Sequence, residues 1–455
     1  MSSETLHDQA WGLSGHPLGV VRDFQSSTET LHDDSAPENV SYELRPVTKR
    51  MQILILISGF LTICITIGFN QSYGVFQRAY VSGDNNFLDA SQGENGALIA
   101  FVGTLGAGLT WGGSIFVNPW MERVSSTRYI TMGGVLLMSL GFGLASLATR
   151  VWHLLLTQGL LYGLGSSMLY FPILSVAPEY FDTHRGSALG FILSGAGIGA
   201  VVLSLIIQAL ISNVGLRWTL RFLCFLNLVI SSPIAITAAP SRFTSKRPTH
   251  VNLSIARKPV FLLSVVAGLL QSSGNLVPLT FLSEFSVTLG YTANFGAILI
   301  AVNNGVNSIS RLLTGFAGDK FGRQNTLILT VIGSATAVCG IWLSSILHTS
   351  KALWILFVVF YGIWAGGYNA LFPVTVAEVF GVQAYASVNG FIYFIRGLGA
   401  LFGSPVAGSM LGKGALNNYL NVVYFDSALL FGASVCVIGV RYFDSIDKGV
   451  FKLKA

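Results

Sequence analysis

The chain has 455 residues, of which 52% are hydrophobic and 10% are charged, and its formal net charge is +6 at pH 7. A soluble domain carries about 25% charged residues, so this chain has too few polar side chains to cover a globular surface in water. Its basic residues are scattered over short segments instead of forming one face, which disfavours a nucleic-acid partner and indicates a protein that lies in a lipid bilayer.

The first 48 residues form a polar tail that we expect to be disordered and cytosolic. The tail contains two similar segments, SETLHD at 3–8 and TETLHD at 28–33. A role in phosphorylation or trafficking and a role as a neutral linker are both open. The first apolar run begins too late in the chain for a cleavable signal peptide.

Twelve apolar runs follow, each long enough to cross the hydrocarbon core as a helix. They lie at 51–77, 95–117, 129–148, 152–177, 187–212, 218–239, 259–282, 293–316, 326–347, 353–377, 387–411 and 422–441. The basic linker 240–258 separates six runs at 49–239 from six at 259–441, and a cytosolic tail follows at 442–455. The pattern predicts an all-α integral membrane protein with two six-helix bundles.

The placement of lysine and arginine predicts the orientation. With a cytosolic N-terminus, 18 of the 26 basic residues fall on the cytosolic side and 6 on the outer side, and Arg311 and Arg396 remain within the membrane. Because short cytosolic loops carry an excess of basic residues, we expect both termini in the cytosol. The plasma membrane is the expected location, since the chain shows no strong retention signal.

The eighth run carries a charged residue, Arg311, on one stripe with Asn304 and Asn307. A charge in hydrocarbon costs about 2.5–3.5 kcal/mol, so this stripe should face the interior of the bundle. We expect Arg311 to bind an anionic or carbonyl-rich group of a small-molecule substrate. The alternative is that Arg311 extends toward the cytosolic end and pairs with Asp319 there.

Arg396 lies in the middle of the eleventh run, within NGFIYFIRGLGALFG. It is either a second cation of the substrate site or a structural group bonded to carbonyls or to Glu378. Gln71 and Tyr73, on the first run, are further candidate substrate-binding residues. The tenth run carries aromatic residues at helical spacing that serve core packing or a flat, bulky substrate: Tyr361, Trp364, Tyr368 and Phe372.

Acidic residues fall at the edges of the runs, and Asp426 opens the twelfth. A proton relay needs a titratable group in the path, so a proton co-substrate would depend on an edge carboxylate or on the substrate's own acid group. The four cysteines are far apart and form no metal or disulfide motif. The chain shows no nucleotide loop, metal cluster or catalytic triad, so we expect no cofactor, no metal and no enzyme activity.

The segment GFAGDKFGRQ, 315–324, supplies the strongest motif. Gly315 allows a close helix approach, Gly322 a tight turn, and Asp319 can cap a helix. With Lys320 and Arg323, these residues are expected to gate the conformational change, as are Glu122 and Arg123 in the weaker copy PWMERVSST. The motif resembles the loop motif of the major facilitator superfamily, which implies that fold and transport by alternating access.

Within that superfamily the chain is similar to the fungal branch of the monocarboxylate porter family. The resemblance rests on GFNQSYGVFQRAY at 68–80, on residues 158–202, on the Arg311 helix and on FIRGLGALFGSPVAG at 394–408. For proton-linked relatives it implies a lysine where this chain has Gln71 and an aspartate where it has Asn307. The resemblance therefore implies an anion site without carrying over the proton coupling.

These observations predict a secondary active transporter of a small organic solute, such as a monocarboxylate, that acts as a monomer. Export of a larger secondary metabolite and import of a vitamin such as riboflavin are the alternatives. A membrane sensor that binds a solute without moving it is a third hypothesis.

Overall fold

The computed structural model describes residues 47–81, 87–88, 96–124, 126–181, 184–238, 251–411 and 416–449. Their regular elements are helices. The first helical group is α1 (Lys49–Val81), α2 (Gly96–Gly112), α3 (Ser114–Arg123), α4 (Thr127–Ala145), α5 (Val151–Leu154), η1 (Leu155–Leu161), α6 (Tyr162–Val176), η2 (Ala177–Glu179), α7 (Arg185–Val214) and α8 (Leu216–Ile236). The second helical group is α9 (Leu253–Ala256), α10 (Pro259–Asn275), α11 (Val277–Thr288), α12 (Ala293–Phe321), α13 (Arg323–Thr336), η3 (Ala337–Trp342), α14 (Leu343–Leu347), α15 (Lys351–Leu411), η4 (Leu416–Asn418) and α16 (Tyr419–Asp447).

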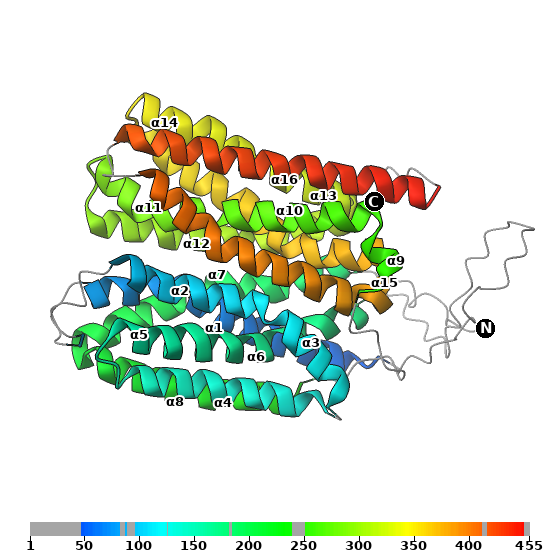
Figure 1. Ribbon diagram of the computed structural model, residues 1–455, viewed down its shortest axis with the longest axis horizontal. Helices are drawn as coiled ribbons and strands as arrows, with labels where there is room; N and C mark the ends of the chain where they lie inside the picture. Colours follow the sequence, from blue (N-terminus) through cyan, green and yellow to red (C-terminus); the bar gives the residue numbers. More distant parts are fainter. Residues whose placement is uncertain are drawn as a thin grey trace, which may run out of the picture. The chain divides into compact units, whose positions relative to one another are not determined.

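Five helices make most of the contact between the two helical groups. α7 packs along α12, while α2 and α3 pack against α15 (Figure 1). The predicted tail at 1–48 and most of the predicted linker at 240–258 lie outside the described residues. The predicted domain boundaries stay a prediction.

Ten helical stretches within the described residues are long and apolar enough to cross a membrane. One of them, Lys351–Leu411, covers two of the predicted runs, and α12 is not among the ten. The asparagines and the arginine of α12 lower its mean hydropathy, although the helix has 29 residues. If α15 is counted as two crossings and α12 as one more, the ten stretches become the twelve predicted crossings.

The predicted loop between the tenth and eleventh runs is replaced by helix. α15 continues through this region, and only Gly381 departs from helical geometry, with φ 80° and ψ 155°. A side chain with a Cβ rarely adopts a positive φ, so glycine allows the chain to change direction here within one residue. The two expected helices therefore lie on either side of Gly381, but the expected loop at 378–386 is reduced to this one non-helical residue.

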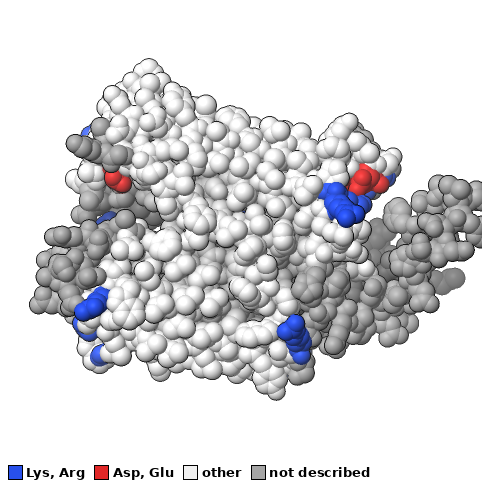
Figure 2. All heavy atoms as spheres, in the orientation of Figure 1, with Lys and Arg blue, Asp and Glu red and all other residues white. Residues whose placement is uncertain are grey.

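Large apolar side chains point outward along the helices, as a lipid-facing surface requires. Leu205, Phe225 and Val435 are each more than 60% exposed. On the face drawn in Figure 2, lysine, arginine and acidic side chains lie near the two ends of the helices, and an uncharged belt separates them. The protein is therefore a multi-pass membrane protein.

The position of Asp426 differs from the expectation. Its run was expected to begin at 422, which places Asp426 at the membrane edge, but α16 begins at Tyr419 and Asp426 lies two turns inside it. The Asp426 side chain is fully buried. Hydropathy alone set the predicted start of the run too late, because Asn421 interrupts the apolar residues of the first turn of α16.

Candidate functional site

Arg311 lies on α12 where this helix meets α7, and it is 4% exposed. Its Nε donates a hydrogen bond to Asn307 Oδ1 at 2.8 Å, and its Nη1 donates to the carbonyl oxygen of Leu193 at 2.7 Å. Leu193 belongs to α7, so the guanidinium spans the contact between the two helical groups. The expected alternative, a pair with Asp319, is not formed, because Asp319 binds other groups described below.

Arg396 lies on α15 and is 1% exposed. Its Nη2 donates to Asn369 Oδ1 at 2.6 Å and reaches Gln271 Oε1 at 3.4 Å. Its Nε is buried and has no hydrogen-bond partner in the described residues. Arg396 therefore binds amides of α10 and α15 instead of the expected alternative Glu378, and it keeps one donor for a further group.

Four aromatic rings surround the Arg396 guanidinium. Its Cζ lies 4.9–5.4 Å from the centroids of Trp111, Tyr368, Phe372 and Tyr393. A cation within about 6 Å of a ring centroid is attracted by the face of the ring. These contacts help to hold a charge in the membrane without a carboxylate, and Trp111 brings in α2 of the first helical group.

A pair of tyrosines joins the surroundings of the two arginines. The hydroxyls of Tyr170, on α6, and Tyr393, on α15, lie 3.3 Å apart. Arg311 is close enough to both tyrosines and to Arg396 to interact with them electrostatically. The arginines, the tyrosines and the amides around them thus form one buried site between the helical groups, which we name the arginine site. It consists of Trp111, Tyr170, Gln271, Asn307, Arg311, Tyr368, Asn369, Phe372, Tyr393 and Arg396.

The arginine site lacks a negative charge among the described residues, since neither guanidinium is paired with a carboxylate. Two buried cations that interact electrostatically repel, and an anionic ligand would relieve that repulsion. Arginine offers a planar set of donors that suits a carboxylate or an enolate. The arrangement can therefore bind a solute that combines an acidic group with a ring.

The other predicted substrate-binding residues lie apart from the arginine site. Asn304 is buried where α12 approaches Gly197 of α7. Gln71, on α1, is half-buried, and no described residue forms a hydrogen bond with its Oε1. The Tyr73 hydroxyl donates to the carbonyl oxygen of Ile99 at 2.7 Å, so Tyr73 holds α1 against α2.

Sequence reasoning did not select five members of the arginine site: Trp111, Tyr170, Gln271, Asn369 and Tyr393. Gln271 and Asn369 are amides inside apolar runs, and this is a signal that could have found them. The aromatic members have no such signal, because buried aromatic residues are common in packed helices.

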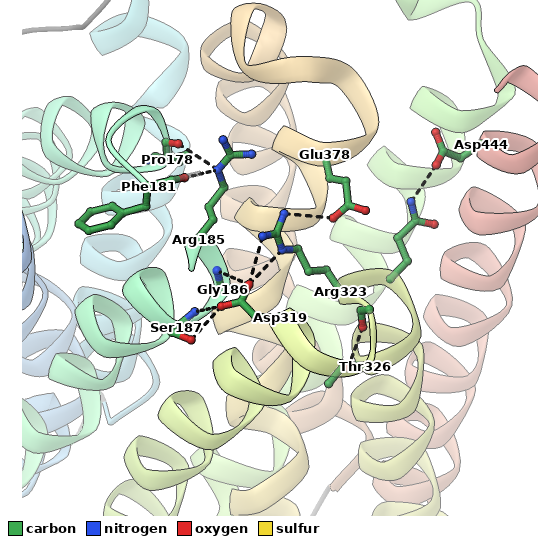
Figure 3. A network of polar contacts seen from close by, with 12 residues as sticks. Pro178, Phe181, Arg185, Gly186, Ser187, Asp319, Arg323, Thr326, Glu378 and Asp444 are labelled. Atoms are coloured by element: carbon green, nitrogen blue, oxygen red, sulfur yellow. Dashed lines mark hydrogen bonds and ion pairs between the residues drawn. The ribbon is translucent and has the colours of Figure 1, made fainter. Parts of the chain in front are cut away.

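A second polar cluster lies at the end of α12, where α7 begins (Figure 3). The Asp319 carboxylate accepts hydrogen bonds from Gly186 N at 2.9 Å, from Ser187 N at 2.7 Å and from Ser187 Oγ at 2.8 Å. These donors belong to the first turn of α7, where free N–H groups and the helix dipole favour an anion. Asp319 therefore ties the second helical group to the first.

Two glycines let the backbones approach at this cluster. A Cβ on Gly315 would come 2.5 Å from the carbonyl oxygen of Gly186, and a Cβ on Gly190 would come 2.6 Å from that of Arg311. Both distances are too short for a real side chain. These glycines thus permit the close contact between α7 and α12, which the hydrogen bonds of Asp319 stabilise.

Arg323 completes this cluster. Its Nη2 lies 3.1 Å from Asp319 Oδ1, and its Nη1 lies 3.4 Å from Glu378 Oε2, which belongs to α15. Burial raises the pKa of the Asp319 carboxyl, but the hydrogen bonds from Ser187, Gly186 and Arg323 outweigh it and hold the pKa below its ordinary value. Asp319, which lies beyond the apolar run 293–316, is therefore ionised at neutral pH.

The remaining residues predicted to gate the transporter make fewer contacts than Asp319 and Arg323. Lys320 is exposed, with its Nζ 5.5 Å from the ring of Phe321. Gly322 has a φ of 103° and separates α12 from α13. Arg123 is exposed at the end of α3, and the side chain of Glu122 lies outside the described ones.

This chain is similar to a known protein family and to individual fungal transporters. The model of the Major Facilitator Superfamily matches residues 49–404. The MFS-type transporter pynF of Aspergillus niger is 30% identical over 86% of this chain and 88% of its own length. The aspyridones efflux protein apdF of Emericella nidulans is 25% identical, over 96% of this chain and 86% of its own.

Solved structures show the same fold. The proton:xylose symporter XylE superposes with a TM-score of 0.69 at 14% identity, over 89% of this chain and 96% of that one. A bacterial homologue of the iron transporter ferroportin superposes with a TM-score of 0.63, over 86% of this chain and 100% of that one. The chain therefore belongs to the Major Facilitator Superfamily, and it is a secondary transporter that spans the membrane many times.

Proposed function

We propose that this chain exports an organic solute that carries an acidic group on a ring system, and that the arginine site binds it. The observation that carries the proposal is the pair of buried guanidiniums, Arg311 and Arg396, without a carboxylate partner in the described chain. The aromatic rings around Arg396 suit a flat or cyclic body better than a two- or three-carbon acid.

The direction of transport is inferred from the relatives. Two of them, of Emericella nidulans and Paecilomyces divaricatus, are named efflux proteins for aspyridones and agnestins. We propose a secondary metabolite as the cargo and the plasma membrane as the location, with both termini in the cytosol. The finer membership of the monocarboxylate porter family belongs to the same proposal, since it rests on Arg311 and on the segments quoted above.

The gating proposal assigns Asp319 to the cytosolic end. There the Asp319–Ser187 contact, together with Arg323 and Glu378, would hold the cytosolic ends of α7 and α12 together. Opening toward the cytosol would break these bonds, and closure would remake them. The support is that three hydrogen bonds to one carboxylate join the two helical groups at this point.

Comparative metabolite profiling tests the proposed function. Cells and medium are compared for a fungal strain with the gene deleted, for the wild type and for a strain with Arg311→Gln. The matched control is Arg128→Gln, at an exposed arginine where α4 begins. An acidic, ring-bearing compound retained in the deleted and Arg311→Gln strains, but secreted by the other two, is the expected result.

The same experiment can overturn the proposal. A compound depleted from the medium by the wild type and left there by the deleted strain would make the chain an importer. Unchanged secretion with Arg311→Gln, at normal protein levels, would remove Arg311 from the site.

A further inference from the structure

Asp426 is an acidic side chain buried inside the second helical group, and the arginine site does not include it. It is 0% exposed, and neither carboxyl oxygen has a hydrogen-bond partner among the described residues. An ionised carboxylate in a dry interior without a partner is very costly, so the group carries a proton in this conformation. A residue that must be neutral here and can ionise when hydrated is suited to binding a proton.

The carboxyl lies against a break in a helix. Asp426 Oδ1 is 2.8 Å from the place that a Cβ on Gly274 would occupy, so the glycine makes room for the carboxyl. α10 ends one residue later, at Asn275, and α11 begins at Val277 with Pro278 in its first turn. Proline has no N–H and cannot donate a helical hydrogen bond across the break. The angle between α10 and α11 is therefore less firmly held than the interior of a helix.

Helix α10 connects Asp426 with the arginine site. Gln271 reaches Arg396 with its side chain, and Ser272 Oγ donates to the carbonyl oxygen of Arg396 at 2.6 Å. Gln271 and Gly274 are three residues apart on α10, or about 4.5 Å along the helix axis. A movement at the break therefore displaces the groups that hold Arg396.

We propose that Asp426 binds the proton that drives this transporter, and that its protonation closes the break between α10 and α11. The inference rests on the proposed function for the cargo, and it adds the coupling ion. In the protonated state Asp426 stays buried against Gly274. When the break opens, water reaches the carboxyl, the proton leaves and the charged group stays hydrated.

Within the part of the chain that the structure describes, few titratable groups face Asp426. α15 contributes Tyr361, whose hydroxyl donates to the carbonyl oxygen of Asn275 at 3.0 Å. α10 and α14 contain no titratable residue, η3 contains only Cys339, and Tyr419 lies two turns earlier on α16. Arg323, on α13, is engaged with Asp319 and Glu378 at the other end of the helix bundle. Glu284, on α11, is exposed, and it serves as the control below.

Infrared spectroscopy of the full-length protein in vesicles tests the protonation without a substrate. The unmodified protein at neutral pH is expected to show the C=O stretch of a neutral carboxylic acid. Asp426→Asn should lose this band, Asp426→Glu should shift it, and Glu284→Gln should keep it. A band that Asp426→Asn leaves unchanged would overturn the proposal, because Asp426 would then be ionised.

Distances between spin labels test the coupling. Labels at Val214 and Leu347 report the separation of the ends of α7 and α14, both exposed and in different helical groups. Between about pH 5 and about pH 9, the distance distribution is expected to shift in the unmodified protein and in Glu284→Gln, and to stay fixed in Asp426→Asn. Asp319 should not contribute, because its pKa is held below the ordinary carboxyl value.

Arg311→Gln separates this inference from the proposed function. It should keep the pH-dependent shift, since Arg311 does not contact Asp426. A shift retained by Asp426→Asn, or one produced by sodium at constant pH, would overturn the proton site. Loss of secretion with Arg311→Gln and retention of the pH response would support both proposals.

Discussion

Replacing Asp319 by asparagine should weaken the contact between α7 and α12. The carboxylate accepts three hydrogen bonds from Gly186 and Ser187 at 2.7–2.9 Å and lies at the start of α7. A hydrogen bond to a charged group contributes about 1.5–3 kcal/mol, and asparagine keeps an oxygen that can accept some of these bonds. We expect a net loss of about 2 kcal/mol, which changes the ratio of closed to open protein about 30-fold.

Spin-label distances measure this change. Labels at Tyr129, exposed at the start of α4, and at Leu329, exposed in the middle of α13, report how far apart the two helical groups lie toward the Asp319 end. The closed distance should dominate in the unmodified protein, and a longer one should appear with Asp319→Asn. Asp447→Asn is the control, because Asp447 pairs with Lys258 in an exposed ion pair within the second helical group. An unchanged distribution with Asp319→Asn would refute the reasoning.

Three further predictions follow from single contacts. Ser187→Ala removes the hydroxyl bond to Asp319 and keeps the backbone one, so the same label distances should show a shift of about 1 kcal/mol, or about fivefold. Gly190→Ala places a Cβ 2.6 Å from the Arg311 carbonyl oxygen and should lower the unfolding free energy by about 1–3 kcal/mol in detergent, whereas Gly305→Ala, with open space around it, should not. Because the Asp319 pKa is held low, its contribution to the closed state should persist at neutral pH and disappear only as the pH falls through that lowered pKa; loss of the closed distance near neutral pH would contradict this.

Hydropathy and charge predicted the membrane protein and the number of crossings, because these depend on local composition, and the segment at 315–324 carried the superfamily motif in its own residues. The polar stripe of α12 was also readable, since Asn307 and Arg311 are one turn apart and do bond to each other. The break at Gly381 was missed, because hydropathy cannot distinguish a loop from a helix that changes direction at one glycine.

The partners of each charge were decided by the tertiary structure. Arg396 was recognised as a cation within the membrane, but its amides and rings come from α2, α10 and α15, which are distant in the chain. The sequence places Asp426 at the edge of its run, whereas in the fold α10 covers it at Gly274. The sequence by itself determined which side chains are too polar for lipid, because that cost belongs to each residue; which neighbours offset the cost depends on helices brought together by packing, and only the fold decided it.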